Sequence, residues 1–128
     1  MSILGQLKVL IVDDTSTSRL LVRDALEQLG IRNIALAPDG EKALKFMMET
    51  PAHLVISDVN MPGLDGLGLL KAIRGYKPIQ RVPFIILTGQ ADRGFIDAAV
   101  KLGVNNYLIK PVTVPKLKAA IEAIIGKL

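Results

Sequence analysis

Carboxylates stand directly after two of the apolar runs in this 128-residue chain. Asp13 and Asp14 follow the first run, and Asp58 follows the third. If these runs are neighbouring strands, the three carboxylates converge, and each pair at about 4 Å repels by roughly 4 kcal/mol at an effective dielectric near 20. A divalent cation compensates such repulsion, and a set of oxygen ligands suits magnesium better than zinc. The pattern therefore predicts a magnesium site.

A lysine and a threonine stand at the ends of two other apolar runs. Lys110 ends the fifth run and adds a fixed positive charge, and Thr88 follows the fourth. Magnesium and a lysine together suit a phosphoryl group, whose three oxygens need neutralising during transfer. A carboxylate held beside them can act as a nucleophile and form an aspartyl phosphate. Asp58, alone at the end of its run, is the best placed.

Each of these residues also has an ordinary structural explanation. Asp14 could cap the helix that follows it, Thr88 could be a strand-end hydroxyl, and Lys110 could be a solvated charge before a turn proline. Taken singly, these explanations suffice. The joint occurrence of such residues at four run ends favours a functional site.

The apolar runs alternate with longer stretches of helical periodicity, which is typical of an α/β fold. The five runs are Lys8–Val12, Asn33–Ala37, His53–Ser57, Pro83–Leu87 and Asn106–Lys110. Three of them are nearly all apolar, as expected for strands covered by helices on both faces. Right-handed crossovers then predict a single-domain, doubly wound (βα)5 parallel sheet over residues 1–128, with its site at the carboxyl ends of the strands.

Five helices are expected between and after the strands. The first should begin near Ser16 or Thr17, either of which could cap it, and end at Gly30. Asp39 should cap the second, and the third should follow Asp65 and end at Gly75. The residues expected to face the sheet are Leu21, Ala25 and Leu29; Ala43, Leu44 and Met47; Leu69, Leu70 and Ile73; Phe95, Ala99 and Leu102; and Leu117, Ala120, Ile121, Ile124, Ile125 and Leu128.

The composition excludes several other chemistries. There is no cysteine, which excludes disulfides and thiolate nucleophiles, and His53 is the only histidine, which excludes a histidine-rich zinc site. His53 opens a strand away from the carboxylates, so we expect a structural role for it. The net charge is +4, yet the few scattered aromatic residues form no stacking platform, so nucleic-acid binding is not expected. No apolar run is long enough to span a bilayer and no secretory signal is visible, so we expect a cytoplasmic protein.

Four motifs together resemble those of a known family. They are V-D-D at 12–14, S-D-V-N-M-P at 57–62, L-T-G at 87–89 and Y-L-I-K-P at 107–111. With them, nearly the whole chain resembles the receiver domains of two-component response regulators, especially the stand-alone chemotaxis regulators of the CheY type. The resemblance implies a flavodoxin-like sheet with strand order 2-1-3-4-5.

The resemblance also implies a role for each site residue. Asp58 would accept the phosphoryl group from a histidine kinase or its phosphotransfer domain. Magnesium would be bound by Asp13, Asp14, Asp58 and the backbone carbonyl of Asn60. Lys110 would pair with the phosphate.

A conformational switch is implied as well. Thr88 would bond a phosphoryl oxygen and move toward it, while the Tyr107 ring turns inward. These changes would alter the surface formed by the fourth helix, fifth strand and fifth helix, which then binds a target. The family also holds the bond before Pro111 in cis. Gln90 departs from the acidic residue of several chemotaxis members, which bears on the rate of dephosphorylation.

These implications lead to one main functional hypothesis. The chain would be a monomeric chemotaxis response regulator that catalyses its own phosphorylation and dephosphorylation, acts on no other substrate, and is read out by the flagellar motor switch. A phosphate sink or relay intermediate without motor binding is the first alternative. A small phosphatase with an aspartate nucleophile is the second, although the second acid that such enzymes need is replaced by Asn60.

Overall fold

The computed structural model describes residues 6–89 and 93–125. Strands and helices alternate along these residues. The elements are β1 (Lys8–Val12), α1 (Ser16–Gln28), β2 (Asn33–Ala37), α2 (Gly40–Glu49), β3 (Leu54–Asp58), α3 (Gly66–Arg74), the 3-10 helix η2 (Lys77–Ile79), β4 (Phe84–Thr88), α4 (Arg93–Lys101), β5 (Asn106–Ile109) and α5 (Val114–Ile125).

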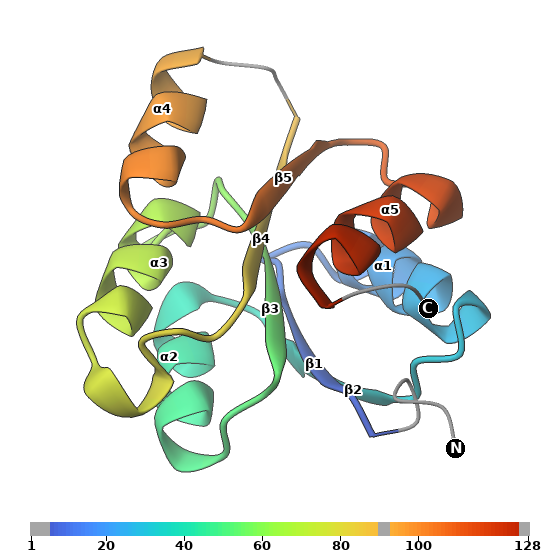
Figure 1. Ribbon diagram of the computed structural model, residues 1–128, viewed down its shortest axis with the longest axis horizontal. Helices are drawn as coiled ribbons and strands as arrows, with labels where there is room; N and C mark the ends of the chain where they lie inside the picture. Colours follow the sequence, from blue (N-terminus) through green and yellow to red (C-terminus); the bar gives the residue numbers. More distant parts are fainter. Residues whose placement is uncertain (1–5, 90–92, 126–128) are drawn as a thin grey trace.

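The five strands form one parallel sheet in the order β2-β1-β3-β4-β5, which confirms the expected fold (Figure 1). Helices α1 and α5 cover one face, and α2, α3 and α4 cover the other. The register pairs Val12 with Ser57 and Asp58 with Leu87, so the carboxyl ends of the central strands lie at one edge. Within the described residues, no helix combines the length and apolar character needed to cross a membrane.

A hydrophobic core lies on each side of the sheet because successive strand residues point to opposite faces. In β1, Leu10 and Val12 join the core under α2, α3 and α4, whereas Val9 and Ile11 join the core under α1 and α5. All four side chains are fully buried. Each such side chain contributes about 1.5–3 kcal/mol through burial, which makes the central strands a rigid base for the site.

Two strands lie one residue later than predicted. The run expected over 53–57 forms a strand over Leu54–Asp58, and the run expected over 83–87 forms one over Phe84–Thr88. Pro83 has no N–H group to donate to the ladder, and Asp58 still pairs with Leu87 at the other end. Asp58 and Thr88 are therefore the last residues of buried strands, while β5 ends at Ile109, so Lys110 lies just beyond its strand.

Helix α1 begins at Ser16, as expected, but its N-cap differs from the prediction. Neither Ser16 nor Thr17 is the N-cap; Thr15 occupies that position, without a side-chain capping bond. The predicted cap of α2 is confirmed, because Asp39 accepts a hydrogen bond from the Lys42 amide at 2.8 Å. Asp65, which precedes α3 as expected, also caps that helix by accepting a hydrogen bond from the Gly68 amide at 2.8 Å.

The buried face of α1 is rotated from the predicted one. Val22, Ala25 and Leu26 are buried, whereas Leu21 is 68% exposed and Leu29 is only partly buried. On the other helices the predicted faces are confirmed: Ala43, Met47, Leu69, Leu70, Ile73, Ala99, Leu117, Ala120 and Ile121 are buried, and Leu44, Phe95, Leu102, Ile124 and Ile125 pack against the cores. Leu128 lies outside the described residues.

Arg74, at the end of α3, connects three segments of the chain. Its guanidinium donates five hydrogen bonds, two to the Gly103 carbonyl and one each to the carbonyls of Gln80 and Val82 and the side chain of Asn105. All five N–H groups are thereby engaged, and every acceptor is neutral. Arg74 thus links the turn after α4 to the segment from η2 to β4, alongside the hydrogen bonds between Asn105 and Phe84.

Candidate functional site

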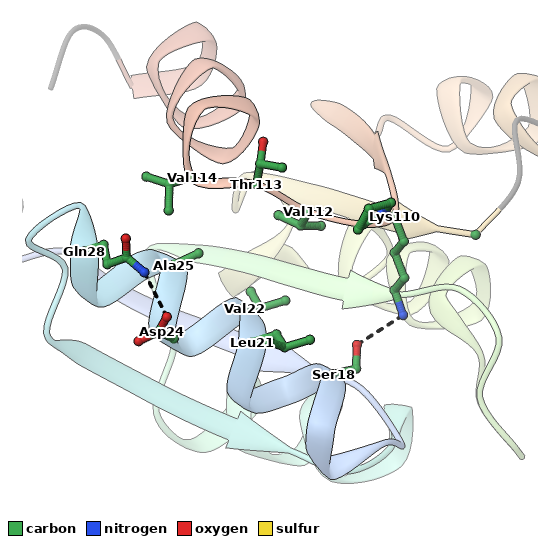
Figure 2. Close-up of a pocket in the computed structure, with 12 residues that line it drawn as sticks. Ser18, Leu21, Val22, Asp24, Ala25, Gln28, Lys110, Val112, Thr113 and Val114 are labelled. Carbon is green, nitrogen blue, oxygen red and sulfur yellow. Dashed lines mark hydrogen bonds between the residues drawn. The ribbon is translucent and has the colours of Figure 1, made fainter.

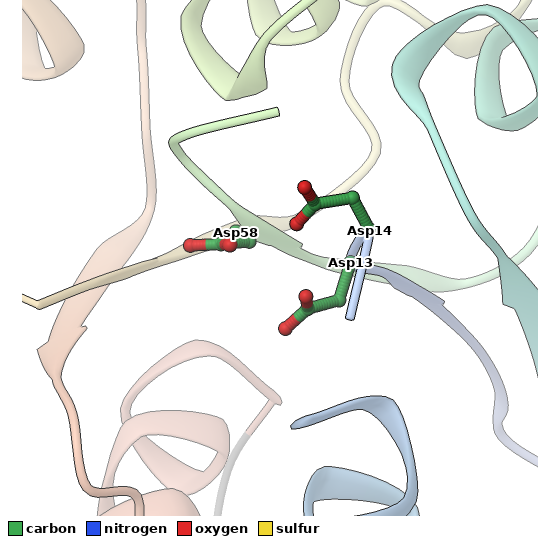
Figure 3. A group of neighbouring side chains, drawn as sticks. All are labelled: Asp13, Asp14 and Asp58. Carbon is green, nitrogen blue, oxygen red and sulfur yellow. The ribbon is translucent and has the colours of Figure 1, made fainter. Parts of the chain in front are cut away.

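Three carboxylates meet at the carboxyl edge of the sheet. Asp13 and Asp14 follow β1, and Asp58 ends β3 (Figure 3). One oxygen from each lies within 4.8 Å of the other two. Asp13 and Asp58 are buried, with 1% and 8% of their surface exposed, and Asp14 is exposed. The convergence expected from the sheet order is therefore present.

The two buried carboxylates are held by backbone amides. Oδ1 of Asp13 accepts a hydrogen bond from the Thr15 amide at 2.9 Å, and Oδ1 of Asp58 accepts one from the Val59 amide at 2.8 Å. The carboxylate that bonds the backbone at the start of α1 thus belongs to Asp13. Asp14, which could have capped this helix, points its exposed carboxylate toward the cluster instead.

Lys110 supplies a positive charge to the same cluster. Its Nζ lies 3.4 Å from Oδ2 of Asp13 and 3.4 Å from Oδ1 of Asp58. It also donates to the Ser18 hydroxyl at 3.2 Å (Figure 2). The Lys110 amide donates to the Thr88 carbonyl at 2.7 Å, and the following bond to Pro111 is cis, as the resemblance implied.

The charges around Asp58 act in opposite directions. Burial, which disfavours the charged form, raises the pKa of Asp58 above its ordinary value. Lys110 lowers this pKa and the neighbouring Asp13 raises it, but burial prevails. The three convergent carboxylates outnumber the one lysine, so a further positive charge at the site would be favourable. The carboxylate oxygens are also the ligands that magnesium prefers. The residues present therefore fit a magnesium ion.

The remaining predicted residues lie around this cluster. Thr88 is buried at the end of β4, and a β-carbon at the next residue, Gly89, would meet nothing within 4 Å. Asn60 is exposed in the loop after β3. Tyr107 on β5 is 38% exposed. Gln90 lies outside the described residues.

Two residues at the site were not predicted. Ser18 bonds Lys110, and Nη1 of Arg19 donates to the Asp13 carbonyl at 2.6 Å. Both lie in the first turns of α1, shortly after Asp13 and Asp14, and this closeness in the sequence is the signal that could have identified them as site residues.

A groove of about 720 Å³ opens beside Lys110, between α1 and the segment that leads into α5 (Figure 2). Apolar side chains supply much of its lining, among them Leu21, Val22, Val112 and Val114. The groove places an accessible surface next to the carboxylate cluster.

Comparison with known families decides what this arrangement is. Residues 9–122 match the model of the response regulator receiver domain. The chain belongs to this family. A relative named "probable chemotaxis protein CheY" from Rhizobium etli is 56% identical over 128 residues, which cover all of this chain and 99% of the relative.

Solved receiver domains share the fold. The chemotaxis protein CheY4 of Vibrio cholerae superposes with a TM-score of 0.85 at 29% identity and covers 92% of this chain and 98% of its own. The receiver domain of a sensor histidine kinase from Pseudomonas aeruginosa has the same TM-score and identity, with 96% and 99% covered, and holds a magnesium ion in its active site cleft. The chain is thus a CheY-type receiver domain, a phosphorylatable response regulator of two-component signalling.

Proposed function

We propose that this receiver domain accepts a phosphoryl group on Asp58 from a histidine kinase and then signals in chemotaxis by binding a target protein. The observation that carries the proposal is the position of Asp58, which ends a central buried strand within 3.4 Å of Lys110 and beside Asp13 and Asp14. A carboxylate in this position lies at the edge of the sheet, beside a lysine and beside two carboxylates with which it could share a magnesium ion.

The transfer is a displacement at phosphorus. An oxygen of the ionised Asp58 forms a bond to phosphorus while the bond from phosphorus to the donor's histidine nitrogen breaks, and that nitrogen keeps the electron pair. In this proposal Lys110, held by Asp13 and Ser18, neutralises a phosphoryl oxygen, and Thr88 donates its hydroxyl to another. We propose that the domain itself supplies this catalysis, so that a small phosphodonor also serves.

The proposed magnesium ligands are Asp13, Asp14, Asp58 and the carbonyl of Asn60. When bound, the ion would neutralise developing negative charge on the phosphoryl oxygens.

The proposed output surface lies on α4, β5 and α5. Val100 on α4 is 60% exposed, and Tyr107 and Ile109 on β5 are each 38% exposed. Exposed apolar side chains on adjacent elements are typical of a protein-binding surface. We propose that a change at Thr88 and Tyr107 alters this surface, and that its target is the flagellar motor switch.

The first test is the intact mass after incubation with magnesium and acetyl phosphate. We expect a gain of one phosphoryl group that requires magnesium and is absent from Asp58→Ala. Asp39→Asn, which removes a partly buried carboxylate but keeps the helix cap, should gain the group like the wild type. No gain in the wild type on rapid quenching, or an undiminished gain in Asp58→Ala, would refute the phosphoacceptor assignment.

A second test separates motor signalling from a phosphate sink. The phosphorylated domain should bind the motor-switch protein more tightly than the unphosphorylated domain does, and Tyr107→Ala should weaken that binding. Return of the phosphoryl group to the kinase without any such binding would instead identify a phosphate sink.

A further inference from the structure

The loop that follows Asp58, residues 59–65, is fixed at both ends. At its start, the Val59 amide donates to the Leu87 carbonyl as well as to Asp58. At its end, the Gly66 amide donates to the Val59 carbonyl at 3.0 Å, and Asp65 caps α3. A displacement in the middle of so short a loop must therefore be absorbed by the few residues between these anchors.

A carboxylate from another helix also holds this loop, near the end that leads into α3. Oε1 of Glu41, in the first turn of α2, accepts a hydrogen bond from the Leu64 amide at 2.8 Å. The backbone of Gly63 has φ +73°, and a β-carbon there would overlap this same oxygen. A β-carbon at Gly40 would overlap the Leu64 carbonyl. The start of α2 and the loop thus approach so closely that glycine is needed on both sides.

The helix that carries Glu41 is itself fixed at this end. Asp39 accepts the amide of Lys42, which orders the first turn of α2, and Ala43 and Met47 bury the helix against the sheet. The Glu41 carboxylate is therefore presented from a rigid element. A hydrogen bond from an amide to an ionised carboxylate is stronger than one between neutral groups.

We infer that Glu41 is a positioning residue for the phosphoacceptor site, because its bond to Leu64 sets the backbone of the loop that carries Asn60. This inference rests on the proposed function, in which the Asn60 carbonyl is a magnesium ligand. Among the described residues, Glu41 bonds the Leu64 amide and forms no ion pair or hydrogen bond with Asp13, Asp14 or Asp58, so its effect passes through the loop.

The test compares three variants of the full chain. Glu41→Ala removes the acceptor, Glu41→Gln removes the charge but keeps an oxygen acceptor, and Glu49→Ala removes a carboxylate from the far end of the same helix. Hydrogen exchange of the metal-free protein measures the opening of the loop, and calorimetric titration with magnesium chloride measures the dissociation constant of the ion.

We expect Glu41→Ala to speed amide exchange at Leu64 and its loop neighbours and to raise the magnesium dissociation constant about fivefold, as for loss of one solvent-exposed hydrogen bond to a charged group. Glu41→Gln should recover most of both effects, and Glu49→Ala should show neither. Gly63→Ala should speed exchange more in the wild type than in the Glu41→Ala background, because the clash with Oε1 of Glu41 is absent there and only the strain of the positive φ remains.

Unchanged loop exchange in Glu41→Ala would overturn the inference. An equal loss of magnesium affinity in Glu41→Gln and Glu41→Ala would also overturn it, because that result indicates a general charge effect. Failure of the proposed function is distinguishable from failure of this inference. If the proposed function is wrong, the wild type takes up no phosphoryl group, whereas amide exchange in the loop of the metal-free protein does not depend on phosphorylation.

Discussion

Replacement of Asp58 by asparagine is expected to stabilise the metal-free protein. At an effective dielectric near 20, unit charges 3.4 Å apart attract by about 5 kcal/mol, which describes Lys110 and Asp58. Asp13 and Asp58 have carboxylate oxygens at most 4.8 Å apart, and at the same dielectric their charges repel by at least about 3 kcal/mol. The pKa of Asp58 is raised although the attraction to Lys110 exceeds the repulsion from Asp13. Burial of the charged carboxylate therefore costs more free energy than the net attraction supplies.

Asparagine has almost the same shape as aspartate and carries no charge to desolvate. We expect Asp58→Asn to raise the free energy of unfolding at pH 7 without magnesium, and each 1 kcal/mol gained should raise the melting temperature by about 4 °C for a domain of this size. Asp39→Asn serves as the control for the change in net charge. Thermal melts followed by circular dichroism measure the difference.

The gain should depend on pH in a defined direction. Because the folded protein binds the Asp58 proton more tightly than the unfolded chain does, the wild type loses stability as pH rises through the folded pKa of Asp58. The advantage of Asp58→Asn should therefore vanish below pH 3.8, the ordinary value, and grow above it. Saturating magnesium should reverse the order of the two proteins, because a bound ion stabilises only a site that holds it.

Two results would refute this reasoning. One is a variant no more stable than the wild type at pH 7 without magnesium. The other is a gain of the same size at pH 3 and pH 7, since this would exclude the ionised Asp58 as its cause.

Three further predictions concern single positions. Without magnesium, Lys110→Ala should lower the free energy of unfolding measured in urea by about 1–3 kcal/mol, because it leaves the buried Asp13 and Asp58 without their lysine. Magnesium should diminish this loss, and an unchanged urea midpoint would contradict the ion pairs. Leu26→Ala should cost about 2–5 kcal/mol in the same assay, whereas Leu21→Ala should change stability by less than about 0.5 kcal/mol, and equal losses would contradict the observed face of α1. Gly89→Ala should raise the free energy of unfolding by up to about 0.4–1 kcal/mol, because its β-carbon enters open space, and the melting temperature should therefore stay unchanged or rise. A lowered melting temperature would contradict that local geometry.

The sheet and its carboxyl edge were predictable from the sequence for a physical reason. Strands buried on both faces must be nearly all apolar, so β1, β3 and β4 are visible as runs, and the polar residues at their ends must then share one edge. The convergence of Asp13, Asp14, Asp58 and Lys110 follows from this argument, while the order of the strands came through the resemblance.

Other features could not be predicted because they depend on contacts between distant segments. The bonds of Glu41 to Leu64 and of Arg74 to Gly103 join polar groups 23 and 29 residues apart, and apolar periodicity carries no information about them. The face of α1 was misassigned for a related reason. Leucines occur at both Leu21 and Leu26, and only packing against the sheet decides which one is buried.

The hydrogen bonds of Arg74 bear on the lifetime of the folded state. Three of the five join Arg74 to Gly103 and Asn105, across 29 and 31 residues, so they cannot form until the segment after α4 has docked beside β4. Contacts that close such long loops are expected to form late in folding. Their loss should then accelerate unfolding more than it slows folding, so this one guanidinium would govern how long a folded molecule persists more than how quickly it forms.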